Sequence, residues 1–422
     1  MKWNNLGGKV TSSLVAVVVG AIIPAVAFLK SGINSWVFPD APLLIQQGYA
    51  ISQGMQYMRS NPSELQYPFG LPAIISIGYK ISEQNAVAMS RMILLLFHFL
   101  TILVIYLILN NLRVNKKIQF VAIVGFSLDP FVLKQALDLQ TEPITAFFIS
   151  ILCLIFLTKL DSPAKQKAIP FFYFFVCFLM IVTRPNLIVP IIGISLFLIY
   201  RWKKDFVSNR TILSAGASFL FYFVAFHAFL FSVFRQFVPI SGNSGQNLAL
   251  ACRLEFLPQY LGYADSKENQ VINAWYFDYL NNIKEIFLNL NPLASVIDLN
   301  REYQRVGIQN CLDNPFETAG LFLIKSISLW RPSTVFGAYG IEVFVISAVF
   351  WIPLTILVVK FLFSGDLTPA QSSLQIFLVI FWGLFTISLI PSATQIRHRI
   401  AVAEQFYWVI LAIYLNKKLV RS

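Results

Sequence analysis

The sequence predicts an all-α, polytopic membrane protein, and three observations lead to this fold class. Of its 422 residues, 57% are hydrophobic and only 12% are charged, and the mean hydropathy is +0.68. Apolar runs long enough to cross a hydrocarbon layer of ~30 Å recur along the chain. Runs such as "AVAMSRMILLLFHFLTILVIYLIL" lack the alternation that strands of a membrane β-barrel require. Helices are therefore expected to satisfy the backbone within the membrane.

Ten membrane-spanning helices are predicted, and two shorter segments bring the total to twelve if they also cross. The ten ranges are 12–30, 87–112, 118–136, 143–160, 168–184, 185–201, 211–234, 338–363, 371–391 and 399–415. The first of them lacks a small-residue cleavage pattern, so we expect it to be retained as a span. The two shorter segments, 67–82 and 317–333, fall short of the usual ~18 to 20 residues of a span. We expect both to begin and end on the outer side, as re-entrant or interfacial pieces.

Lys and Arg set the predicted orientation, because cytoplasmic loops carry an excess of both. Four clusters and two N-terminal lysines are expected in the cytoplasm: Arg113/Lys116/Lys117, Lys159/Lys165/Lys167, Arg201/Lys203/Lys204/Arg210 and Lys417/Lys418/Arg421, with Lys2 and Lys9. The net charge of +12 then reflects orientation in a membrane, and no nucleic-acid partner is expected. The predicted location is the plasma (inner) membrane, with any active site on the outside or periplasmic face.

This topology divides the chain into three parts and gathers its unusual charges on one side. The parts are an N-terminal transmembrane module, 1–234, with a first outer loop at 31–86; an extracytoplasmic region, 235–337; and C-terminal transmembrane helices, 338–422. The residues expected at the outer face are Asp40, Asp138, Glu142, Arg184, Arg331, Arg397, His398 and Arg399.

Structural explanations compete with functional ones for several of these residues. Asp40 could cap a helix that begins near Pro42, and Glu142 could sit before Pro143 at the start of the next span, where an acid is comfortable. Arg397 and Arg399 could be interfacial anchors. The histidines inside spans, His98 and His227, are expected to serve packing or interhelical hydrogen bonds.

The four cysteines do not form a metal or thiol-redox motif. Cys153 and Cys177 fall within predicted spans, whereas Cys252 and Cys311 both lie in the extracytoplasmic region. This second pair could form a disulfide if that compartment is oxidising. No metal site is predicted.

Eight motifs follow one another along the chain: "PDAPLLIQQGYAISQG", "LQYPFGLPAIISIGY", "SRMILLLFHFL", "FSLDPFVLKQALDLQTEPITAFF", "TRPNLIVP", "SGNSGQNLALAC", "LFLIKSISLWRPS" and "RHRIAVAEQFYWVILAIYL". In this order they resemble the GT-C superfamily of membrane glycosyltransferases, in particular the branch with protein O-mannosyltransferases and the aminoarabinose transferase of lipid A. No single motif is diagnostic, and their order and spacing over nearly the whole chain carry the resemblance.

The resemblance implies roles for individual residues. Asp40 matches the first-loop acid, which implies the catalytic base, and Glu142 matches the second-loop acid. The family's first loop usually starts with two acids, and here it reads Pro39-Asp40, so a divalent cation is not indicated. Asp138, Gln46 and Tyr67 are expected to contact substrate.

The chemistry can be argued from the residues as well. Nucleotide sugars are cytoplasmic, so an enzyme of the outer face needs a donor such as a polyprenyl-phosphate-linked sugar. One carboxylate can deprotonate an acceptor hydroxyl as it attacks the anomeric carbon, which gives inversion. Arg side chains can meet the charge of the departing lipid phosphate. Arg397, Arg399 and His398 are the first candidates for this role, and Arg184 and Arg331 are further ones.

The expected function is therefore a membrane glycosyltransferase of cell-envelope glycan biosynthesis, which adds a hexose or pentose to a lipid, glycan or protein acceptor. A transporter or flippase of lipid-linked sugars is the main alternative, and it should place charges near mid-span. A polymerase or ligase of surface polysaccharide is the other.

Overall fold

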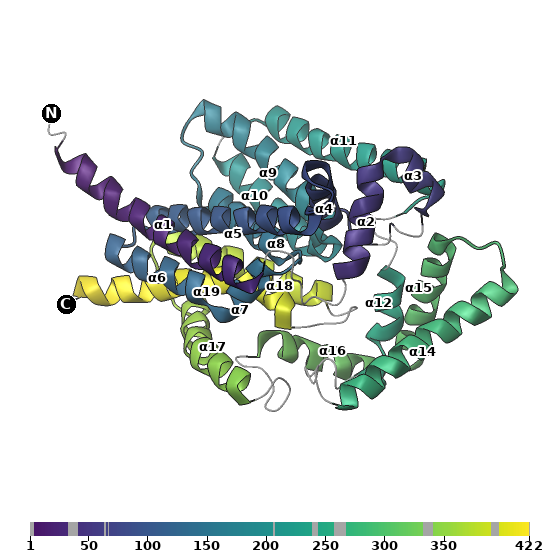
Figure 1. Ribbon diagram of the computed structural model, residues 1–422. Helices are drawn as coiled ribbons and strands as arrows, with labels where there is room; N and C mark the ends of the chain where they lie inside the picture. The colour runs from purple at the N-terminus through teal and green to yellow at the C-terminus, as the bar shows by residue number, and fades with distance from the viewer. Residues whose placement is uncertain are drawn as a thin grey trace.

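The structure is a computed structural model and describes residues 4–32, 41–62, 65, 67–205, 207–238, 244–256, 267–331, 341–389 and 396–421. Over these residues the chain is helical and contains no strand (Figure 1). The predicted fold class is confirmed, since the chain is an all-α, multi-pass membrane protein.

Six helical stretches in the described part of the chain are long and apolar enough to cross a membrane. They belong to α5 (Ala86–Asn111), α9 (Pro163–Thr183), the turn η2 (Pro185–Leu187) with α10 (Ile188–Lys204), α11 (Asn209–Phe234), α17 (Ile341–Leu362) and α18 (Pro369–Leu389). A seventh results if α6 (Lys116–Leu128) and α7 (Pro130–Leu137) count as one span bent by 58°. The bend has a local cause. Asp129 accepts hydrogen bonds from the backbone N–H groups of Phe131 and Val132 and so caps α7, whose first residue is Pro130.

The other three predicted spans are also helices. They are α1 (Asn4–Ser31), α8 (Glu142–Leu157) and α19 (Ile396–Arg421). The two shorter predicted segments correspond to α4 (Gly70–Ile81), with 12 residues, and α16 (Pro315–Trp330), with 16. At the ~1.5 Å rise of a helix these reach about 18 and 24 Å, less than the ~30 Å of a hydrocarbon core.

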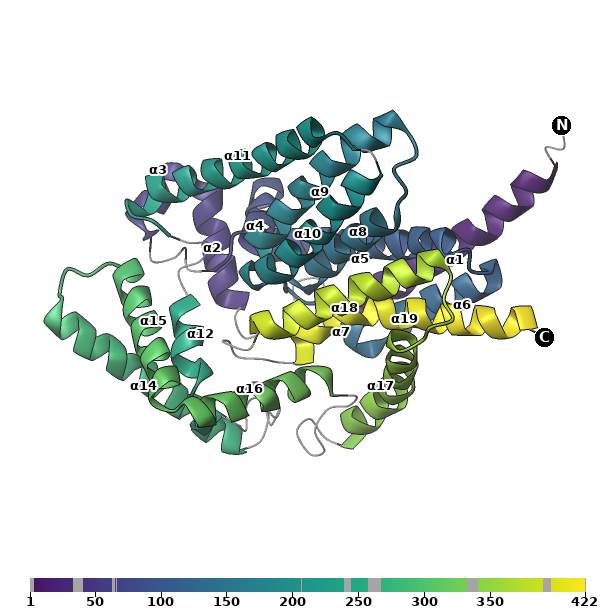
Figure 2. The ribbon, with the colours of Figure 1, turned by 180° about the vertical axis from the view of Figure 1, so that it is seen from behind.

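Hydrogen bonds gather the basic clusters at one end of the bundle. The backbone N–H of Asn115 donates to Asn416 Oδ1 at 2.8 Å, and the Arg201 guanidinium donates to the Phe156 carbonyl at 2.6 Å. The Lys417 ammonium donates to the backbone carbonyl of Asp366, in the loop before α18. The N- and C-terminal helices also project from this end (Figures 1 and 2). We refer to it as the basic end.

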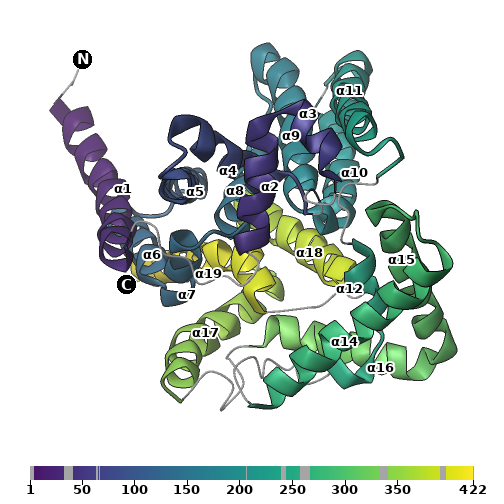
Figure 3. The same ribbon diagram turned by 45° about the vertical axis from the view of Figure 1, so that its right-hand side comes forward.

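The opposite end carries short helices and the predicted extracytoplasmic region. These elements are α2 (Ala41–Gln53), α3 (Met55–Ser60), α12 (Ser244–Ala251), η3 (Leu254–Phe256), α14 (Lys267–Leu290) and α15 (Val296–Asp313). Helices α12, α14, α15 and α16 lie together to one side of the spanning helices (Figure 3).

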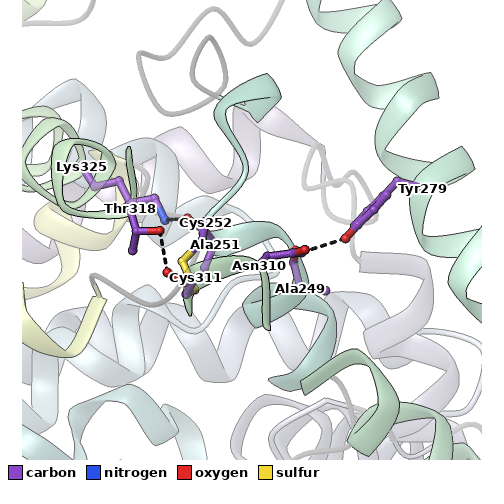
Figure 4. The surroundings of a disulfide bond; sticks show 8 residues. All are labelled: Ala249, Ala251, Cys252, Tyr279, Asn310, Cys311, Thr318 and Lys325. Carbon is purple, nitrogen blue, oxygen red and sulfur yellow. Dashed lines mark hydrogen bonds between the residues drawn. A yellow bond between two sulfur atoms is a disulfide. The ribbon is translucent and has the colours of Figure 1, made fainter. Parts of the chain in front are cut away.

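Close packing and a disulfide join α12 to α15. The backbone N–H of Gly245 donates to Asn300 Oδ1 at 2.7 Å, and a Cβ at Gly245 would lie 2.1 Å from the Asn300 carbonyl oxygen, so only glycine fits. Cys252 and Cys311 form a disulfide (Figure 4). The sequence left this pair conditional on an oxidising compartment, and the structure contains it.

The core of the spanning region lies where α5, α8 and α19 meet. Helix α19 contacts α5, α6, α7, α8, α16 and α17. Each of its residues from 399 to 410 is buried, whereas most of the spans on the periphery have one exposed apolar face. Helix α19 is thus a central helix of the bundle.

Candidate functional site

The predicted second-loop acids lie in the connection between α7 and α8 and are both buried. Asp138 follows the last residue of α7 in an extended conformation and accepts hydrogen bonds from the Leu139 N–H at 2.8 Å and from Gln140 Nε2 at 3.2 Å. Glu142 is the first residue of α8, before Pro143, so it also occupies the helix N-terminus that the structural alternative requires. Only 5% of Asp138 and 3% of Glu142 is exposed.

Glu142 forms a buried ion pair with Arg184, which lies just past the end of α9. The Arg184 guanidinium donates to Glu142 Oε1 at 2.7 Å. Two predicted site residues that are 42 positions apart in the sequence are therefore in direct contact. The pair links the start of α8 to the end of α9.

A small cavity, lined mostly by apolar side chains, adjoins this ion pair. Its volume is about 20 Å³, and its polar lining consists of His98, Gln135, Glu142 and Gln405, from four different helices. Among the described residues, His98 Nε2 and Gln405 Oε1 have no hydrogen-bond partner. A cavity of this size has room for one water molecule, which these two atoms could bind. His98 also stacks on Phe126, with ring centroids 5.5 Å apart, in agreement with its expected packing role.

Arg399 lies on the other side of α19 and is fully buried. Its Nη2 atom lies 3.0 Å from Glu404 Oε1, its Nη1 atom donates to the Arg331 carbonyl, and its guanidinium lies 4.2 Å from the ring centroid of Trp351. The side chain is thus inside the protein rather than at a membrane surface, where an interfacial anchor would lie.

The neighbours of Arg399 are placed differently. Arg331 directly follows α16 and is half-buried, with a hydrogen bond of 3.3 Å from Nη1 to Ser328 Oγ. His398, in the first turn of α19, is also half-buried. Arg397 belongs to the same turn, and its side chain lies outside the described residues. The carbonyl of Arg331 joins the end of α16 to the start of α19.

The two glutamines predicted to form a polar face of α2 differ in their exposure to solvent. Gln46 is exposed, whereas Gln47 is buried and pairs with the backbone of Tyr67. The Tyr67 N–H donates to Gln47 Oε1 at 2.8 Å, and Gln47 Nε2 donates to the Tyr67 carbonyl at 2.9 Å. The half-buried Tyr67 is therefore held against α2, and Gln46 is left at the surface. Asp40 itself lies outside the described residues, directly before α2.

Arg91 was not predicted as a site residue, yet it ties together the two segments that lead to the predicted acids. Its guanidinium donates to the carbonyl of Leu137, just before Asp138, at 2.8 and 2.6 Å. It also donates to the carbonyl of Gly32, at the end of α1, and to Ser31 Oγ. A cation at two helix C-termini is electrostatically favourable. The signal in the sequence was an Arg near the start of an apolar span.

Two interior acids were also missed. Glu404 pairs with Arg399, and Asp129 Oδ2 accepts a hydrogen bond of 3.4 Å from Trp408 Nε1. An acid within the apolar run "AVAEQFYWVIL" was the available signal for Glu404. Across the described ranges, no group of three or more His, Cys, Asp or Glu residues could hold a metal ion.

No protein-family profile and no curated protein sequence matches the chain. The structure defines the class of the protein as a multi-pass, α-helical membrane protein. The resemblance to the GT-C superfamily is carried only by the sequence motifs of this chain.

Proposed function

We propose that this protein is an integral membrane glycosyltransferase. It would transfer a sugar from a polyprenyl-phosphate-linked donor to a hydroxyl of a lipid, glycan or protein acceptor. One observation carries the proposal: two pairs of charged residues are in contact at helix ends opposite the basic end. Glu142, at the start of α8, pairs with Arg184, just past α9. Arg399, near the start of α19, donates to the carbonyl of Arg331, just past α16.

Two independent features support an outward orientation of this end. The basic clusters lie together at the other end, and Lys and Arg favour the cytoplasmic side. Cys252 and Cys311 form a disulfide, and disulfides persist in oxidising compartments outside the cytosol. Both favour a plasma-membrane protein whose site faces outward.

In the proposed mechanism, Asp40 takes the proton of the acceptor hydroxyl as its oxygen attacks the anomeric carbon. The bond between that carbon and the phosphate oxygen breaks, and the lipid phosphate leaves with the electron pair. A single displacement inverts the anomeric configuration. Arg397 and His398 would meet the phosphate charge, because Arg399 is engaged by Glu404. Glu142 would hold Arg184 in place rather than act as a second base.

The test uses the purified full chain in lipid with polyprenyl-phosphate sugars. We expect Asp40→Asn to bind donor normally and to lose transfer by about 10²- to 10⁴-fold, the usual contribution of a general base. Asp161→Asn is the matched control, since Asp161 is an exposed acid at the basic end, paired with Lys165. Near-normal transfer by Asp40→Asn would rule out Asp40 as the base. An absence of transfer by the unsubstituted chain with every donor would reject the enzyme.

A flippase of lipid-linked sugars is the second candidate, and the interior charges favour it. The span of α6 and α7 is broken at Asp129, and α19 carries a buried Arg399–Glu404 pair. Broken helices and buried ions are typical of transporters, although these usually occur in two related halves. A flippase would move labelled lipid-linked sugar between the leaflets of a vesicle without making a covalent product, whereas a polysaccharide polymerase or ligase would give products longer by several sugars.

A further inference from the structure

The outward face of α16 is apolar. Phe316, Leu323 and Ile327 are 92%, 64% and 63% exposed, respectively. Their spacing of seven and four residues puts them on one side of the helix, and the residues between them on this side, Ala319 and Gly320, are small. We call Phe316, Leu323 and Ile327 the α16 stripe. The only charged residue among the exposed residues of α16 is Glu317, in its first turn.

The inward face of α16 carries polar as well as apolar side chains. Thr318, Lys325 and Ser328 are buried beside Leu321 and Leu329. The Lys325 ammonium donates to the Ala251 carbonyl at 2.5 Å, and Thr318 Oγ1 donates to the Cys311 carbonyl at 3.2 Å (Figure 4). These bonds hold α16 against both halves of the Cys252–Cys311 disulfide.

This arrangement differs from that of a helix on a water-soluble domain. The outward face of such a helix is polar. Helix α16 instead buries Lys325 and turns Phe316, Leu323 and Ile327 outward, so the medium around its outer face is expected to be apolar.

The position of α16 identifies that medium. Its C-terminal end joins the spanning helices, because Trp330 Nε1 donates to Thr386 Oγ1 of α18 at 2.7 Å, and the Arg331 carbonyl accepts a hydrogen bond from Arg399 of α19. On α18, the residue after Thr386 is Ile387, which is 57% exposed like the other lipid-facing apolar residues of the spans. The α16 stripe therefore leads toward the surface that the spanning helices present to lipid.

We propose that α16 inserts into the outer leaflet of the membrane, with the α16 stripe in contact with lipid acyl chains. The helix has 16 residues, and Glu317 is expected to keep its N-terminal end near the water boundary. Leu323 and Ile327 then lie deeper in the leaflet. Helix α16 would anchor the disulfide-linked helices α12 and α15 to the bilayer surface. This proposal is independent of the glycosyltransferase proposal.

The experiment measures the access of lipid-soluble oxygen and a water-soluble nickel complex to nitroxide labels. The variants Leu323→Cys and Ile327→Cys are labelled in the full chain, reconstituted in phosphatidylcholine vesicles. Gln309→Cys, at an exposed polar position of α15, is the control. The free thiols Cys153 and Cys177 are buried, and the unsubstituted chain gives the background labelling. We expect high oxygen and low nickel access at 323 and 327, with the reverse at 309.

Two other outcomes would overturn the proposal. High nickel access at 323 and 327 would place the α16 stripe in water. Low access to both reagents, with spin–spin broadening that grows with protein density in the vesicle, would show that a second copy of the chain covers it. Because each variant changes one exposed side chain, we expect all three to fold, and thermal unfolding verifies this before labelling.

Discussion

Arg91 and the Glu142–Arg184 pair show how single side chains organise the charged end of the bundle. Each joins segments that are far apart in the chain: Arg91 links residues 46 and 59 positions away, and Arg184 links one 42 positions away. The sequence predicted that Glu142 and Arg184 lie on the same side of the membrane. It did not predict which charges pair, because that depends on the packing of helices that are distant in sequence.

Replacement of Arg91 should destabilise the protein strongly. Arg91→Gln keeps a polar side chain but cannot reach the carbonyls of both Gly32 and Leu137, and each lost charge-assisted hydrogen bond costs about 1.5–3 kcal/mol. Thermal unfolding in detergent should show a large fall in Tm. The control Lys167→Gln changes an exposed lysine and should have little effect. Equal Tm values for the two variants would contradict the role of Arg91.

The Glu142–Arg184 pair should behave as a coupled unit. Glu142→Gln leaves a buried guanidinium without its counter-charge, which typically costs about 3–5 kcal/mol. Arg184→Met should cost a similar amount, and the double variant should cost less than the sum of the two. Unfolding free energies of the four proteins give the coupling directly. Additive effects would show that the two side chains do not depend on each other.

Individual elements were predicted better than the contacts between them. All ten predicted spans lie in helical segments, because long apolar runs have few other structures open to them in a membrane. In the part of the chain that the structure describes, six of these stretches, or seven with α6 and α7 joined, are long and apolar enough to cross. The break within 118–136 was missed, although Asp129 followed by Pro130 is the local signature of a new helix start. The bond between Trp408 and Asp129, which links residues 279 positions apart, has no local signature.

The start of α15 gives a pH-dependent prediction. Ser295 and Asp298 form a capping box, and the hydrogen bonds from the Ser295 hydroxyl and backbone N–H lower the pKa of the Asp298 carboxyl below its ordinary value of 3.8. A depressed pKa means that the stabilisation is present above the unfolded-state pKa and is lost as the pH falls through the folded-state value. Asp298→Asn should therefore lower Tm at pH 6 and converge with the unsubstituted chain toward pH 3. A difference that stays constant over this range would exclude a contribution from the Asp298 charge.

On the scale of the whole molecule, the proposed orientation can be tested without reference to activity. Single cysteines in place of Lys117 and Lys204, at the basic end, should react with a membrane-impermeant maleimide only after the cells are opened. A cysteine in place of Asn281, on the exposed side of α14, should react in intact cells. Labelling of the Lys117→Cys variant from outside would contradict the ten-span topology. Cys252 and Cys311 should react only after reduction.

The candidate site was anticipated in part on this scale. Positive-inside reasoning placed Asp138, Glu142, Arg184 and Arg399 on one side, and the structure brings all four to one end. The sequence could not reveal that Arg399 is enclosed by Trp351 and Glu404, because the burial of Arg399 depends on how α17 and α19 cross. Gln46 and Gln47 adjoin in sequence but have opposite exposure, which follows from the helical rotation of ~100° per residue.

The central position of α19 has a consequence for biosynthesis. The helix fills the space between α5, α6 and α8 with an almost continuous buried surface, yet it is made after all of them. When α5, α6 and α8 enter the membrane, the surfaces that α19 will cover face lipid, and Asp129 has no indole to bond. The bundle therefore cannot close as its first helices leave the translocon. The partly assembled bundle must persist while more than two hundred further residues, from 158 to 395, are translated. During this interval, before α19 is made, membrane chaperones and quality-control proteases can act on the unfinished bundle.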